Sequence, residues 1–87
     1  MEQIIVDDSY YQLLSMFEWH TIRNIKSLYA YTWIYKRKHK RRLFMHRLIA
    51  GTPHDMVCHH RNRASLDNRE INLINMSRAE HKRLHEN

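Results

Sequence analysis

Residues 58–85 constrain the fold of this chain more than any other segment, because they combine a cluster of histidines with a strand–loop–strand–helix pattern. Half of the chain's eight histidines fall in this segment: two are adjacent, at positions 59 and 60, and two are four residues apart, at positions 81 and 85. Adjacent residues of a strand point to opposite sides, whereas residues four apart on a helix share one face. The histidines can therefore approach one another from a strand end and from a helix.

Local signals in this part of the chain predict a ββα unit. Residues 56–58 are a short apolar run typical of a strand, residues 66–69 are turn-like, and residues 71–74 can form a second strand. Ser77 and Glu80 have the spacing of a capping box, which marks the first turn of a helix. This helix is expected to span residues 78–85, with its two histidines one turn apart.

The beginning of the chain is expected to supply a scaffold. Residues 4–6 are β-branched and predict an edge strand, and Asp7 and Asp8 are candidate N-caps for the helix that follows. Four apolar residues have the spacing of one helix face: Tyr10, Leu13, Leu14 and Phe17. Residues 17–21 alternate between apolar and polar, which indicates a strand, and residues 23–27 are expected to form a loop.

A β-hairpin is predicted next. Residues 28–35 are aromatic and β-rich, residues 36–42 are seven consecutive basic residues (counting His39), and residues 43–45 are apolar again. Residues 46–50 favour a short helix, which Gly51 and Pro53 would end. The expected fold class is α+β: one domain over residues 1–87, with a small antiparallel sheet and helices in residues 1–55 and a ββα module in residues 56–87.

The basic tip of the hairpin has two interpretations. It can be a solvated loop that discourages aggregation, or it can contact phosphates of a nucleic acid, which makes binding fall steeply with salt. Four aromatic residues alternate along the preceding strand and can either stack bases or pack against a helix: Tyr29, Tyr31, Trp33 and Tyr35.

Composition limits the partner and the compartment. The chain has 15 Lys and Arg against 9 Asp and Glu, and this net charge of +6 on 87 residues favours nucleic acid or an anionic membrane surface as partner. Cys58 is the only cysteine, which rules out an intramolecular disulfide and favours a reducing cytoplasm. No apolar run approaches the roughly 20 residues that span a bilayer, so no membrane-spanning segment is expected. Of the two partners that the charge allows, nucleic acid and not a membrane is the expected one.

The histidines suit a metal centre with an open position. Neutral imidazole binds borderline transition metals, and a third ligand at the strand end would leave room for water or a phosphate oxygen. One histidine of the adjacent pair can bind metal while the other faces the attacking water, and phosphodiester hydrolysis needs both roles. Two alternatives stay open. One is surface histidines without metal; the other is a structural zinc site in a non-catalytic nucleic-acid-binding module, formed by Cys58, His60, His81 and His85.

Residues 58–73 resemble, without a gap, the HNH nuclease superfamily with its ββα-metal motif, and more closely the small homing-type HNH endonucleases of phages and introns. The resemblance rests on His60, Asn62, Leu66-Asp67-Asn68-Arg69 and Asn72-Leu73. Upstream, residues 6–14, Trp19 and residues 45–49 are similar to the lead-in of those proteins, so the resemblance covers nearly the whole chain.

The resemblance implies a role for each matching position. His60 would be the general base that activates water, and Asn72 would brace the loop that holds it. A divalent ion would be held by His59, His81 and, as in colicin-type nucleases, His85. His59 stands where the family usually has Asp, and exchanging carboxylate for imidazole moves the metal preference from Mg²⁺ toward Zn²⁺, Ni²⁺ or Mn²⁺.

The expected function is therefore that of a metal-dependent endonuclease that hydrolyses DNA phosphodiester bonds. It would use one divalent ion (Mg²⁺, Mn²⁺, Zn²⁺ or Ni²⁺) and act as a monomer or weak homodimer in the cytoplasm of a bacterial cell or a phage-infected host. One site per chain makes nicking of a single strand the simplest activity. Nine basic residues are expected to hold the DNA backbone: Lys36, Arg37, Lys38, Lys40, Arg41, Arg42, Arg61, Arg63 and Arg69.

Overall fold

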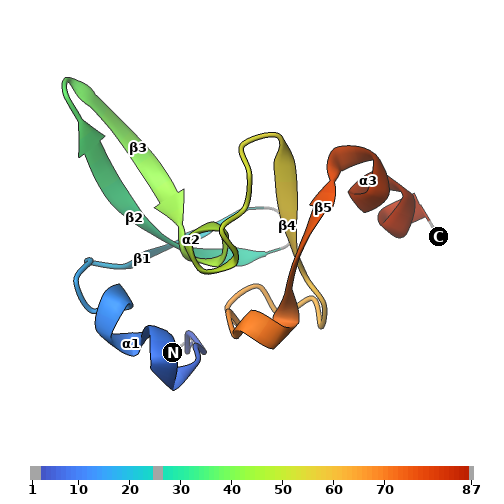
Figure 1. The fold of residues 1–87 in the computed structure, drawn as a ribbon, viewed down its shortest axis with the longest axis horizontal. Coiled ribbons are helices and arrows are strands. Elements are labelled where there is room, and N and C mark those ends of the chain that lie inside the picture. Colours follow the sequence, from blue (N-terminus) through green and yellow to red (C-terminus); the bar gives the residue numbers. More distant parts are fainter. Residues whose placement is uncertain (1–2, 25–26, 87) are drawn as a thin grey trace.

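The computed structural model describes residues 3–24 and 27–86, with the backbone alone at residues 85 and 86. Its strands form two antiparallel sheets, one of order β1-β2-β3 and one of order β4-β5. The predicted α+β class is confirmed, and the elements follow one another as shown in Figure 1: α1 (Asp8–Leu14), β1 (His20–Arg23), β2 (Leu28–Lys36), β3 (His39–Phe44), α2 (Met45–Ala50), β4 (Met56–His60), a 3₁₀ helix (Glu70–Asn72), β5 (Leu73–Ser77) and α3 (Arg78–Glu86).

The two sheets stand side by side, with the β2–β3 hairpin projecting at one end of the molecule and α3 lying at the other (Figure 1). Helix α2 lies between them and contacts strands of both sheets. Across residues 3–24 and 27–86, no helix has the length and apolar character needed to cross a membrane.

The predicted hairpin is confirmed, but its basic residues do not form a loop. Only Arg37 and Lys38 form the turn, and Arg37 adopts a left-handed φ of 58°. Lys36 pairs with His39 and the ladder continues from there, so residues 39–42 are strand residues. The expectation of a basic tip over residues 36–42 was wrong in extent, because a two-residue turn lets both strands run to the end of the hairpin.

The scaffold differs from its predicted boundaries. Helix α1 ends at Leu14, before Phe17, and the indole of Trp19 donates to the Leu14 carbonyl at 2.8 Å. The same carbonyl also accepts from the Phe17 amide at 3.1 Å, so two donors satisfy the end of the helix. The strand predicted at residues 17–21 is β1, and it begins only at His20.

The N-terminal segment attaches to the ββα module instead of forming a strand. Ile5 makes a single parallel bridge with Asp67: its amide donates to the Leu66 carbonyl at 2.8 Å, and its carbonyl accepts from the Asn68 amide at 2.7 Å. The Asp7 carboxylate does not cap α1; it accepts from the Glu70 amide at 2.7 Å. These hydrogen bonds tie the N-terminal segment to residues 66–70, in the connection between β4 and β5.

One hydrophobic core is shared by the scaffold and the module. Its buried residues come from both halves of the chain: Leu14, Ala30, Met45, Ile49, Leu66 and Leu73. Helix α2 is fixed to the β4–β5 pair on the side of Cys58 and Asn75: the Cys58 thiol lies 3.7 Å from the His46 carbonyl, and the Asn75 amide donates to the Ala50 carbonyl at 2.9 Å. The two halves therefore form one packed unit.

The strand–strand–helix order of the C-terminal segment is confirmed. Strand β4 extends to His60, which pairs with Leu73, and the strand predicted at residues 71–74 begins only at Leu73, after the 3₁₀ turn. The capping box is present, since the Ser77 amide donates to the Glu80 carboxylate at 3.0 Å and the Glu80 amide donates to the Ser77 hydroxyl at 3.1 Å. Helix α3 starts where this box predicts.

Candidate active site

The end of β4 directs its two histidines to opposite sides, as the alternation of a strand requires. His60 is buried toward the core, with 7% of its surface exposed. His59 lies against α3, where its ring centroid is 5.6 Å from that of His81 at an interplanar angle of 67°. Sequence reasoning therefore separated these neighbours correctly in space.

His60 is held in one orientation by a buried amide. Its Nε2 lies 2.8 Å from Oδ1 of Asn68, a residue with no exposed surface. The tautomer that matches this contact has the proton on Nε2 and the lone pair on Nδ1. Burial lowers the pKa of His60, although the Asn68 hydrogen bond and the charge of Asp67 act the other way. His60 is therefore a neutral imidazole at pH 7, which is the form that can accept a proton.

His46 is a second buried histidine at this site, and sequence reasoning gave it no role. Its ring centroid lies 5.0 Å from that of His60 and 5.6 Å from that of Tyr29. Burial lowers the pKa of His46 to about 3, and the nearby His60 and Arg47 act in the same direction. The only sequence signal was its place in residues 45–49, because a lone histidine at a helix start has no distinctive spacing.

Protonating these histidines is expected to destabilise the fold. The pKa of His46 is lower in the folded state than its ordinary value near 6.5, so the unfolded chain binds more protons and stability falls as pH drops below about 6.5. Between pH 7 and pH 5, wild type should lose roughly 2 kcal/mol more than His46→Gln. Urea unfolding of the metal-free proteins measures this difference, and parallel pH profiles would contradict it.

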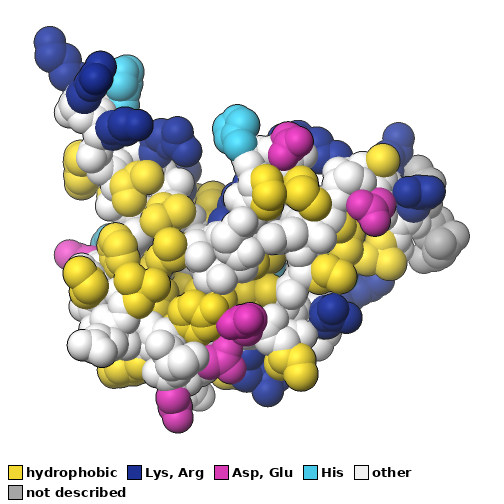
Figure 2. Space-filling view, viewed as in Figure 1, with side chains coloured by type: hydrophobic (Ala, Val, Ile, Leu, Met, Phe, Trp, Pro, Cys, Tyr) yellow, Lys and Arg dark blue, Asp and Glu magenta, His cyan; other side chains and the backbone are white. Residues whose placement is uncertain are grey.

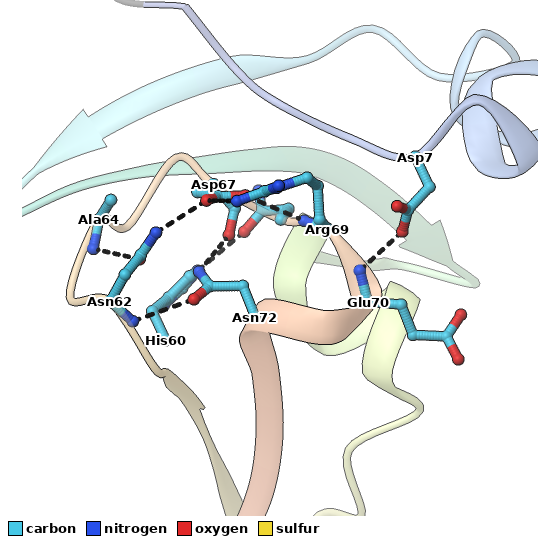
Figure 3. A network of polar contacts seen from close by, with 9 residues as sticks. Asp7, His60, Asn62, Ala64, Asp67, Arg69, Glu70 and Asn72 are labelled. Carbon is cyan, nitrogen blue, oxygen red and sulfur yellow. Dashed lines mark hydrogen bonds and ion pairs between the residues drawn. The ribbon is translucent and has the colours of Figure 1, made fainter.

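Asn72 ties together the loop that follows His60 (Figure 3). Its Oδ1 accepts from the Asn62 amide at 3.0 Å, and its Nδ2 donates to the Asp67 carbonyl at 2.8 Å. Its backbone carbonyl accepts from the Arg61 amide at 2.7 Å. One buried side chain thus fixes both ends of residues 62–67, next to His60.

Asp67 is the second centre of this network. Its carboxylate accepts from Nδ2 of Asn62 at 2.8 Å and from Nε and Nη2 of Arg69, each at 2.8 Å (Figure 3). The hydrogen bonds from Arg69 hold the pKa of this carboxyl well below its usual range. Arg69, predicted to hold DNA, is engaged in this ion pair, which gives it a structural role in the loop.

The two described histidines of the predicted metal site lie close enough together to share one ion. Zn–N bonds of about 2.1 Å place the centroids of two ligating rings about 5 to 6 Å apart, and His59 and His81 are separated by 5.6 Å. The third predicted ligand, His85, has a side chain outside the described residues. Among the side chains that are described, no three of His, Cys, Asp or Glu are close enough to hold a metal together. The alternative structural zinc site loses support for this reason. Three of its four proposed ligands are described (Cys58, His60 and His81), and they do not lie close enough to hold a metal together.

A cleft of about 420 Å³ opens beside His46 and His81, between the first sheet and the ββα module, and neither His59 nor His60 is among the described residues that line it. None of the described residues that line it is acidic, and they include two histidines and two arginines: Ile22, Arg23, Asn24, Tyr29, Phe44, His46, Arg47, Val57, Cys58 and His81. Arg47 donates to the backbone carbonyls of Met56 and Pro53, each at 3.0 Å. Because both acceptors are neutral, these hydrogen bonds do not neutralise the positive charge of Arg47. The cleft suits an anion, and sequence reasoning did not select either arginine.

The remaining predicted DNA-binding residues lie on the surface. Figure 2 shows Lys and Arg side chains gathered along the outer half of the β2–β3 hairpin, above hydrophobic side chains nearer its base. Arg61 and Arg63 are exposed on the loop after β4. Comparisons of this chain with family models, with curated proteins and with solved structures find no match.

Proposed function

We propose that this protein is a metal-dependent endonuclease that hydrolyses phosphodiester bonds of DNA. The observation that carries the proposal is the separation of two histidine roles at the end of β4. His60 is a neutral, oriented imidazole, and one residue earlier His59 lies against His81 of α3. His81 also lines the neighbouring cleft, whose described lining residues include no acidic one. Hydrolysis of a phosphodiester needs a proton acceptor and a cation site next to an anion-binding cleft.

The protein's own residues would divide the work. His60 takes the proton from the attacking water, and Asn72 keeps the loop behind it closed. His59 and His81, with His85 as a third ligand, would hold one divalent ion, and that ion would neutralise charge that develops on the phosphate oxygens. Imidazole ligands favour Mn²⁺, Ni²⁺ or Zn²⁺ over Mg²⁺.

DNA as the substrate is supported by charge and by backbone strain. The net charge is +6, and the basic hairpin and the cleft present cations on exposed surface. Arg37 and Arg63 are the described non-glycine residues with positive φ, at 58° and 63°. Glycine would adopt this conformation without strain, so the arginines there are consistent with a side-chain function such as phosphate binding. A monomer with one site would nick one strand in the cytoplasm, and double-strand cleavage would need two copies.

The metal role is tested by the metal dependence of cleavage. Nicking of supercoiled plasmid by His81→Ala should need at least about tenfold more Mn²⁺ or Ni²⁺ for half-maximal rate than wild type, because losing even an outer-shell partner costs 10- to 100-fold in affinity. His54→Ala removes an exposed histidine of the α2–β4 loop and serves as the control, with an unchanged metal requirement. Equal requirements in all three proteins would remove His81 from the metal site.

A further inference from the structure

The β2–β3 hairpin has two faces of different chemistry. Residues directly opposite in an antiparallel pair share a face. One face, called here the cation–ring face, consists of three such pairs: Tyr31 with Phe44, Trp33 with Arg42, and Tyr35 with Lys40. The other, the far face, consists of Thr32 with Leu43, Ile34 with Arg41, and Lys36 with His39.

On the cation–ring face, each basic group lies over aromatic rings. Nζ of Lys40 is 4.2 Å from the ring centroid of Trp33, and the guanidinium carbon of Arg42 is 5.0 Å from the same ring and 5.1 Å from that of Tyr31. These cation–π interactions hold two long side chains in place. The cations cover Trp33 and Tyr31, two of the rings that bases would need for stacking, while the charges themselves stay exposed and open to phosphates.

The cation–ring face leads to the cleft. Neighbouring ring centroids are separated by 5.4 Å from Trp33 to Tyr31, by 6.2 Å from Tyr31 to Phe44 and by 5.7 Å from Phe44 to His46. Phe44 and His46 both line the cleft, together with His81. A strand that lies along this face is therefore brought to the candidate active site.

The far face points elsewhere. Thr32 is buried on that side, and its hydroxyl donates to the Glu18 carbonyl at 2.8 Å, in the segment that joins α1 to β1. Arg41 and Lys36 are as basic as Arg42 and Lys40, but they lie on the side that faces this segment. The charge of the hairpin is thus distributed on two faces, of which one continues into the cleft.

We propose that the cation–ring face is a docking surface for the phosphate backbone of double-stranded DNA, with Lys40 and Arg42 as its anchors. The inference deepens the proposed function and rests on it, because it assigns the substrate a form and a path to the cleft. Duplex is favoured over single strands because cations lie over the rings of Trp33 and Tyr31, so the surface offers charge for a backbone. Tyr35 is the ring of this face that stays open to unpaired bases, with 71% of its surface exposed.

Two double variants with equal charge change test the proposal. Lys40→Gln with Arg42→Gln alters the cation–ring face, and Lys36→Gln with Arg41→Gln alters the far face; all four residues are exposed. Binding of a labelled duplex of about 20 base pairs, long enough for several phosphates to be neutralised at once, is measured by fluorescence anisotropy at several salt concentrations. Chelator is present so that no cleavage occurs, and circular dichroism checks that each protein stays folded.

The cation–ring variant should bind the duplex at least about tenfold more weakly than wild type. The slope of log Kd against log salt should fall by about 1.8, which is about 0.9 for each phosphate that the variant no longer neutralises. The far-face variant should keep the wild-type slope. Equal reductions of affinity and slope in the two variants would overturn the proposal, since the hairpin would then act as undifferentiated charge.

A single strand of the same sequence separates backbone docking from base stacking. Wild type should bind the duplex more tightly than the single strand. Tighter binding of the single strand, abolished in Trp33→Ala and retained in the Lys40 and Arg42 variant, would show that the rings stack bases and would overturn the proposal. Because binding is measured without cleavage, a protein that docks duplex as predicted but never cuts would refute the nuclease and leave the docking surface standing.

Discussion

Replacing His60 with alanine is expected to lower the rate of metal-dependent DNA nicking by about a thousandfold, within the range that a general acid–base group contributes. His60 is buried, its Nε2 is fixed by Asn68, and burial lowers its pKa, so the ring is neutral and oriented at pH 7. Alanine offers no group to take the proton from water, while the His59 and His81 pair is left in place.

The alanine variant also leaves space beside His46 and an unpaired Asn68 oxygen, so loss of folding must be separated from loss of chemistry. His60→Gln is the second variant, because its amide can donate to Asn68 but cannot act as a base near pH 7. Both variants should be folded by circular dichroism and nearly inactive, and His54→Ala should cut like wild type. Nicking by folded His60→Gln at the wild-type rate would show that His60 is not the base.

Asn72→Ala is expected to cause the largest loss of stability, roughly 3 kcal/mol. The substitution removes two hydrogen bonds of a buried side chain, and it leaves the Asn62 amide and the Asp67 carbonyl without this partner. A domain of this size has only about 4 to 13 kcal/mol of total stability, so the loss is a large part of it. Urea denaturation at pH 7, with the slope of the transition compared between proteins, measures it.

Asn75→Ala is the matched control for Asn72→Ala. Asn75 also makes two hydrogen bonds, accepting from the Thr52 hydroxyl at 2.6 Å and donating to the Ala50 carbonyl at 2.9 Å, but it is half-buried, so these partners can bond to water instead. The substitution should cost about 1 kcal/mol. Equal losses of stability at the two positions would mean that Asn72 is an ordinary hydrogen-bonding residue and not the brace of the loop.

The elements that could be predicted from sequence are those with strong local signals. The alternating aromatic residues of β2, the capping box of Ser77 and Glu80 and the glycine that ends α2 all act within a few residues of one another. The prediction that residues 36–42 form a basic tip was wrong in extent for a physical reason. A run of charged residues can still pair as a strand when each of its side chains reaches solvent. Residues 39–42 are exposed and still pair with β2.

The candidate site was predicted where spacing encodes geometry. Strand alternation separated His59 from His60, whereas the approach of His81 to His59 depends on how α3 packs on β4 and was expected from the family resemblance. Asn68 and His46 could not be assigned roles in the same way, because their interactions with His60 depend on how the loop and α2 pack. The ion pair of Arg69 with Asp67 could not be predicted either. From the sequence, an exposed arginine in this motif is typical of DNA binding, and only the structure shows that its guanidinium is paired with Asp67.

The most direct test is a single time course of supercoiled plasmid with wild-type protein and Mn²⁺ or Ni²⁺, in which a chelator is added midway and excess metal is restored later. Nicked circles should accumulate, stop forming in chelator while circular dichroism shows a folded protein, and accumulate again when metal returns. Plasmid that stays supercoiled with Mg²⁺, Mn²⁺, Ni²⁺ and Zn²⁺ alike, in the presence of folded protein, would contradict a DNA-cleaving function.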